Sequence, residues 1–212
     1  MMSLTQLLKE HADESAAKFP EEIKVIMRKA IDELEASKLV NKALKTGDIF
    51  PSFNLPNASG NIINSLELLD KGPLVITFYR GGWCPYCNIE LKALQNVLPQ
   101  IQEKGAELIA ISPESPDNSL STKEKNELSF EVLTDKDNSF ARDLSLVYKL
   151  PKDLVSLYRK FGINLDNSQN NTNSELPIAA TYVIDSNGKI KYHFLKEDYK
   201  LRADPKEILE AL

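Results

Sequence analysis

Cysteine and histidine are scarce in this sequence of 212 residues, which contains two of each. A structural zinc site needs about four such ligands, so zinc is a weak alternative here. Secreted disulfide scaffolds carry several cysteines spread along the chain, whereas this chain has only Cys84 and Cys87. A disulfide between such near neighbours closes almost no loop and adds little stability. In a reducing compartment the pair therefore indicates redox chemistry, which is favoured over the alternative of two plain buried cysteines.

Long apolar runs and an excess of positive charge are also missing. Apolar stretches such as Leu74 to Phe78 fall far short of the roughly 20 residues of a membrane-spanning helix. The 26 basic and 31 acidic residues give a net charge of −5, which argues against nucleic acid as a partner. Charges from Lys9 onward leave no apolar stretch for a secretory signal. We therefore expect a cytoplasmic protein that binds neither membranes nor nucleic acid.

The chain divides into a helical extension, residues 1–44, and a larger domain, residues 45–212. In the extension, apolar residues recur at spacings of three and four with charges between them, which predicts amphipathic helices. These helices either cap the main domain or form half of a dimer contact. Gly47, Asp48 and Pro51 mark the entry to the main domain.

The main domain shows alternating strand and helix patterns. A buried strand over 74–79, a helix ending near Lys104-Gly105 and a strand over 107–112 predict a βαβ unit with a parallel pair. The pattern at 181–184 and 189–194 predicts an antiparallel hairpin. The remaining expectations are strands near 52–55, 62–63 and 131–133, helices near 118–127, 139–148, 152–161 and 205–212, and a polar loop over 166–174.

The helix that follows the first buried strand places both cysteines at its start. Pro85 suits the first helical position, so Cys84 becomes the N-cap and Cys87 falls in the first turn. Unpaired N–H groups and the helix dipole favour negative charge there, which lowers the pKa of a thiol. Arg80 adds a positive charge close by, unless it forms a surface ion pair instead.

Three further residues are candidates for substrate approach. Gly82 allows a substrate to come close to the backbone. Trp83 and Tyr86 flank the cysteines, where they either contact substrate or pack into the core. A strand leading into this glycine–tryptophan–cysteine segment at a helix start is a far more specific signal than an isolated Cys-x-x-Cys.

The segment from Phe78 to Cys87 resembles the active-site segment of peroxiredoxin-like proteins of the alkyl hydroperoxide reductase and thiol-specific antioxidant (AhpC/TSA) family. The likeness extends from about Gly47 to Leu212, and the helical extension suits the subgroup that has a Cys-x-x-Cys. The resemblance implies an α/β thioredoxin fold, with a mixed central sheet flanked by helices, and a thiol peroxidase activity.

Carried over by position, Cys87 matches the peroxidatic cysteine, and Cys84 replaces a threonine that helps to bind peroxide. Arg80 replaces a proline. The arginine that many relatives supply before the late hairpin strand falls on Ala179, so Arg80 is the candidate substitute for its charge.

The resemblance implies that Cys87 attacks hydrogen peroxide or an organic hydroperoxide and that Cys84 then forms a disulfide with it. A thioredoxin- or glutaredoxin-type dithiol would restore the pair, with no cofactor. The resemblance also suggests a homodimer, because relatives often form dimers. In the alternative, a thioredoxin-like disulfide reductase, Cys84 is the nucleophile. A redox-inert binding or sensing protein is the third reading.

Overall fold

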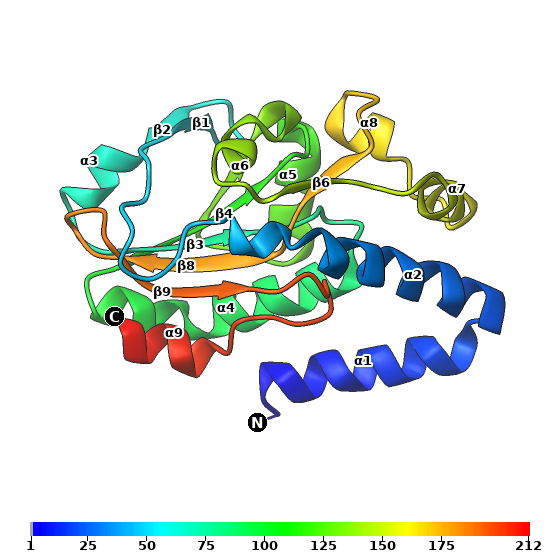
Figure 1. Cartoon of the computed structure of the whole chain (residues 1–212). Helices are drawn as coiled ribbons and strands as arrows, with labels where there is room; N and C mark the ends of the chain where they lie inside the picture. The colour runs from blue at the N-terminus through cyan, green and yellow to red at the C-terminus, as the bar shows by residue number, and fades with distance from the viewer. Residues whose placement is uncertain (1) are drawn as a thin grey trace.

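The computed structural model describes residues 2–212 and is built around one five-stranded sheet (Figure 1). The strand order is β5-β4-β3-β8-β9. Strands β3, β4 and β5 are parallel, while β8 is antiparallel to both β3 and β9. The strands are β3 (Leu74–Phe78), β4 (Glu107–Ser112), β5 (Glu131–Thr134), β8 (Ala180–Ile184) and β9 (Ile190–Leu195). The predicted βαβ pair and the late hairpin are confirmed.

Side chains of β3 alternate between two hydrophobic cores, because successive residues of a strand point to opposite faces. Val75 packs with α4 (Pro85–Glu103) and α9 (Pro205–Ala211) on one face. Ile76 packs on the other face with α3 (Ser65–Leu69) and α6 (Ser139–Asp143). The sheet is therefore covered on both sides, as the fully buried β3 requires.

The N-terminal extension forms the two predicted helices, α1 (Leu4–Lys18) and α2 (Glu21–Ser37). Ser3 and Gln6 make a capping box that fixes the start of α1. Leu4 and Leu8 of α1 are buried in the same core as α4, while α2 packs against α7 (Lys152–Lys160). Figure 1 shows both helices together at one side of the molecule.

The remaining elements lie around this framework. Strands β1 and β2 form one antiparallel pair and β6 and β7 form another. These elements are β1 (Asn54–Pro56), β2 (Ile62–Asn64), η1 (Leu39–Asn41), α5 (Pro116–Lys125), η2 (Lys136–Asn138), β6 (Val147–Lys149), α8 (Leu165–Gln169) and β7 (Glu175–Pro177). Within residues 2–212, the structure contains no helix that is both long and apolar enough to cross a bilayer.

Two secondary-structure predictions were wrong in part. The helix predicted over 139–148 ends at Asp143, because Ser145 adopts a positive φ of 58° and Val147–Lys149 pairs with β7. The polar loop predicted over 166–174 begins with the short helix α8, which Asn164 caps by accepting the backbone N–H of Asn167.

Candidate active site

The site lies where β3 leads into α4. The backbone turns after Phe78, and α4 begins at Pro85 with Cys84 as its N-cap, as the sequence predicts. Cys87 then lies in the first helical turn. Both cysteines are free thiols in this structure, so it describes the reduced state of the pair.

Positive charge and hydrogen bonding favour a thiolate at Cys84. A hydrogen bond from the Cys87 thiol, together with the positive charge of Arg80, lowers the pKa of Cys84 to about 5, although burial acts in the opposite direction. The Arg80 Nη1 lies 3.8 Å from the Cys84 Sγ. At neutral pH Cys84 is therefore mainly a thiolate, which is the nucleophilic form of cysteine.

Arg80 is itself fixed by a cage of aromatic rings. Its guanidinium lies 4.3 Å from the ring centroid of Tyr199, 5.1 Å from that of Trp83 and 5.8 Å from that of Tyr158. It also donates a hydrogen bond to the Tyr158 hydroxyl. Because Arg80 is only 2% exposed, the alternative of a surface ion pair is wrong.

Cys87 is as buried as Cys84 but has a different set of partners. Its Sγ accepts contacts from the backbone N–H of Arg80 at 3.5 Å and from the Arg202 Nη2 at 3.4 Å. Burial, reinforced by the neighbouring Cys84 sulfur, raises the pKa of Cys87. Cys87 is therefore the protonated partner while Cys84 is a thiolate.

Arg202 is a residue of this site that the sequence did not reveal. It follows β9, 115 residues after Cys87, and forms a buried ion pair with Glu90 in which the Nε–Oε2 distance is 2.6 Å. Burial raises the pKa of Glu90 to about 7. The family arginine position, Ala179, is buried just before β8, and Arg80 and Arg202 bring the positive charge to the two sulfurs instead.

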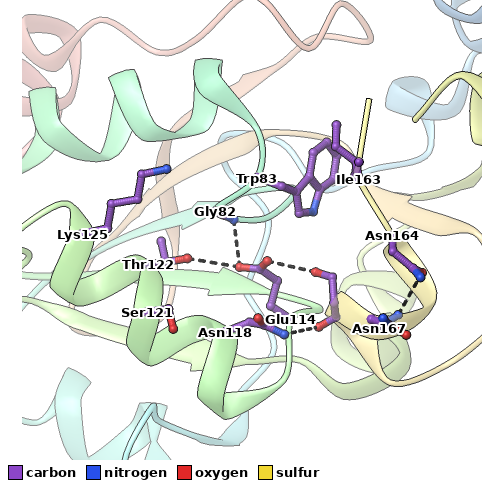
Figure 2. Close-up of a pocket in the computed structure, with 12 residues that line it drawn as sticks. Gly82, Trp83, Glu114, Asn118, Ser121, Thr122, Lys125, Ile163, Asn164 and Asn167 are labelled. Carbon is purple, nitrogen blue, oxygen red and sulfur yellow. Dashed lines mark hydrogen bonds between the residues drawn. The ribbon is translucent and has the colours of Figure 1, made fainter. Parts of the chain in front are cut away.

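Gly82 does not lie in the same cavity as Cys84. Its backbone N–H donates to the Glu114 carboxylate at 2.8 Å, and both residues line a second cavity of about 340 Å³ (Figure 2). A Cβ at Gly82 would lie 2.0 Å from the Thr122 Oγ1, so glycine is required for this close approach. Glu114 also accepts from Thr122 and Ser168, which holds the loop before Cys84 in place.

A larger cavity of about 610 Å³ leads to the cysteine pair. Cys84, Arg80, Trp83 and Tyr86 line it, whereas Cys87 does not. The other lining residues are His11, Ala12, Ser15, Ala16, Phe19, Lys24, Met27, Arg28, Ile31, Pro85, Tyr158, Phe161, Ile163, Tyr199 and Lys200. Trp83 is common to both cavities, and of the predicted approach residues only Gly82 lies away from the larger one.

Comparison with known families identifies the matched part of the chain. The model of the AhpC/TSA family matches residues 46–193, which is more than half of the sequence. The chain belongs to the AhpC/TSA family. The matched region includes Arg80, Cys84 and Cys87, whereas α1, α2 and Arg202 lie outside it.

Individual relatives agree with this family. The chain is 26% identical to peroxiredoxin Bcp of Escherichia coli K12, over 74% of this chain and 88% of that protein. It is 27% identical to the chloroplastic peroxiredoxin Q of Oryza sativa subsp. japonica, over 74% of this chain and 61% of that protein.

Solved structures agree on the fold. Peroxidoxin BcpB from Mycobacterium tuberculosis matches with a TM-score of 0.62 and 20% identity, covering 79% of this chain and 96% of its own. The reduced 2-Cys peroxiredoxin of Plasmodium vivax matches with a TM-score of 0.60 and 19% identity, covering 78% and 79%. The predicted α/β thioredoxin fold, with a mixed central sheet flanked by helices, is confirmed.

Proposed function

We propose that this protein is a thiol-dependent peroxidase that reduces hydroperoxides through Cys84 and Cys87. Family membership supports the reaction class. The observation on which the proposal depends most is the position of the Cys84 sulfur, which borders a cavity and lies 3.8 Å from the Arg80 guanidinium. The lowered pKa of Cys84 agrees with this position.

The two thiols supply the two electrons that reduce the hydroperoxide, and an external reductant then reduces the resulting disulfide. The Cys84 thiolate attacks one oxygen of the hydroperoxide, an S–O bond forms, and the O–O bond breaks to release an alcohol or water after protonation. Arg80 stabilises negative charge on the sulfur and on the departing oxygen. Cys87 then attacks the sulfenic acid, which releases water and leaves a Cys84–Cys87 disulfide.

We assign the first attack to Cys84, which reverses the order implied by family position. Both side chains are buried, but Cys84 borders the cavity and has a lowered pKa, whereas Cys87 does not border it and has a raised pKa. Oxidation of Cys84 removes the neighbouring negative charge that opposes ionisation of Cys87. Contacts from Arg202 and from the Arg80 amide then stabilise the Cys87 thiolate for the second step.

A thioredoxin-like disulfide reductase is the second candidate function. The same observation favours it, because a first cysteine that borders a cavity and a second cysteine behind it also suit attack on a disulfide. In that reaction Cys84 would form a mixed disulfide, and Cys87 would release the reduced partner.

The proposed reductant is a thioredoxin- or glutaredoxin-type dithiol, which would reduce the Cys84–Cys87 disulfide by exchange. We also propose the cytoplasm as the compartment, because two cysteines three positions apart suit redox exchange better than they suit a secreted disulfide scaffold. A homodimer remains a proposal from family resemblance, to be checked by light scattering of the reduced protein.

The two candidate functions separate in a pair of assays on the same preparation. We expect peroxide consumption to be coupled to NADPH oxidation in the presence of thioredoxin and thioredoxin reductase. Insulin reduction by this protein, driven by dithiothreitol, should stay near its background rate. Rapid insulin reduction without peroxide consumption would reject the peroxidase and support the reductase.

A further inference from the structure

The N-terminal helices build part of the cavity that leads to Cys84. From α1 and α2, and from the turn between them, come His11, Ala12, Ser15, Ala16, Phe19, Lys24, Met27, Arg28 and Ile31. These residues lie outside residues 46–193, the part of the chain that matches the family model. The extension therefore adds a wall to a site whose reactive residues belong to the family domain.

Packing fixes this wall in place. His11 of α1 meets Tyr86 of α4 edge-on, with 4.9 Å between the ring centroids. Phe19, between the two helices, stacks on Phe161 after α7 with a centroid distance of 5.3 Å. Ile31 of α2 is only 4% exposed. The cavity is thus a built feature of the packed chain.

The chemistry of the lining favours an apolar and uncharged occupant. Alanine, methionine, isoleucine and aromatic side chains make up much of the wall. Four cations line the cavity: three of them pair with carboxylates outside it, and the fourth, Arg80, lies beside the Cys84 sulfur. These ion pairs are Lys24–Glu21, Arg28–Asp32 and Lys200–Asp198.

We propose that the N-terminal extension is a substrate-selecting element that binds the hydrocarbon body of a bulky, neutral organic hydroperoxide. The hydrocarbon lies against α1 and α2, and the –OOH group reaches the Cys84 sulfur beside Arg80. The volume of about 610 Å³ falls in the range of pockets that hold organic ligands, about 300–1,000 Å³. This inference rests on the proposed peroxidase function, and the reaction is the one given above, with the alcohol as product.

Ala16 provides the test because it lines the cavity from α1. The neighbouring Ala17 is exposed, as Ala16 is, but does not line the cavity, so it is the matched control. We compare kcat/KM for cumene hydroperoxide and for hydrogen peroxide in the wild type, in Ala16→Trp and in Ala17→Trp. Met27→Lys, which introduces a charge into the α2 wall, is a second variant in case Ala16→Trp perturbs folding.

Ala16→Trp and Met27→Lys are expected to lower kcat/KM for cumene hydroperoxide by about tenfold or more. The value for hydrogen peroxide should fall less, so that the ratio of the two kcat/KM values decreases, because that substrate does not need the apolar wall. Ala17→Trp should match the wild type for both substrates.

Two different failures remain distinguishable. If wild-type protein consumes neither hydroperoxide, the proposed function itself is rejected. If it consumes hydrogen peroxide but both wall variants keep the wild-type ratio of the two kcat/KM values, the peroxidase stands and the selecting role of α1 and α2 is overturned. A preference of the wild type for hydrogen peroxide over cumene hydroperoxide would also overturn it.

Discussion

Replacing Arg80 with methionine removes the positive charge nearest to the Cys84 sulfur while it keeps a long, unbranched side chain. The Nη1–Sγ distance of 3.8 Å corresponds to a Coulomb attraction of about 4 kcal/mol at an effective dielectric of about 20. Loss of that energy would raise the pKa of Cys84 by about three pH units, which is an upper bound. The hydrogen bond from the Cys87 thiol, which is the largest cause of the lowered pKa, does not involve Arg80, and a serine hydroxyl takes its place in the assay below. We therefore expect the pKa of Cys84 to rise by about one to three pH units.

The assay is the pH dependence of Cys84 alkylation by iodoacetamide. It is performed in a Cys87→Ser background, which leaves one thiol and retains a hydroxyl donor beside it. Provided that this hydroxyl preserves the wild-type pKa of about 5, Cys84 is about nine-tenths thiolate at pH 6. A pKa of about 7 would leave roughly a tenth as thiolate, so the alkylation rate at pH 6 should fall about tenfold.

Arg80→Lys is the matched control because lysine keeps the charge but loses the planar group that stacks among the three aromatic rings. Its alkylation midpoint should stay closer to the wild-type value than that of Arg80→Met. Circular dichroism and thermal unfolding establish that both variants fold. A folded Arg80→Met protein with an unchanged midpoint would refute the electrostatic role of Arg80.

Three further predictions concern pH and packing. The pKa of Cys84 is depressed in the folded state, so its thiolate stabilises the fold above the unfolded value of about 8.5, and this stability is lost as pH falls through about 5. Urea titrations should show the stability of the wild type relative to Cys84→Ser falling across that window, and a constant difference would contradict the assignment. Gly82→Ala should cost about 1–3 kcal/mol, since its Cβ would lie 2.0 Å from the Thr122 Oγ1, and Thr122→Ala should recover part of the loss in chemical denaturation. Arg202→Met should slow disulfide formation after one equivalent of peroxide, measured by stopped-flow tryptophan fluorescence, and an unchanged rate would remove Arg202 from the second step.

The sequence predicted the elements whose signals are local. A short β-branched run identified β3, and Pro85 at the first helical position placed Cys84 at the N-cap. The parallel pairing of β3 and β4 followed from the length of the helix between them. Each of these features depends on residues within a few turns of one another.

Features that depend on distant packing could not be predicted in the same way. Arg202 reaches Cys87 across 115 residues, and no motif around Arg202 indicates that contact. Val147–Lys149 continues an apparent helical pattern, and only its pairing with β7 makes it a strand. The cavity wall on α1 and α2 likewise arises only when the extension packs beside α4.

The most direct test of the account is to identify the sulfur that a single equivalent of hydrogen peroxide oxidises. Cys84→Ser and Cys87→Ser are treated at pH 7 in the presence of dimedone, which traps sulfenic acid, and the labelled peptide is identified by mass. The account predicts rapid labelling of Cys84 in Cys87→Ser and almost none of Cys87 in Cys84→Ser. Rapid labelling of Cys87 in Cys84→Ser, with no reaction of Cys84, would contradict it.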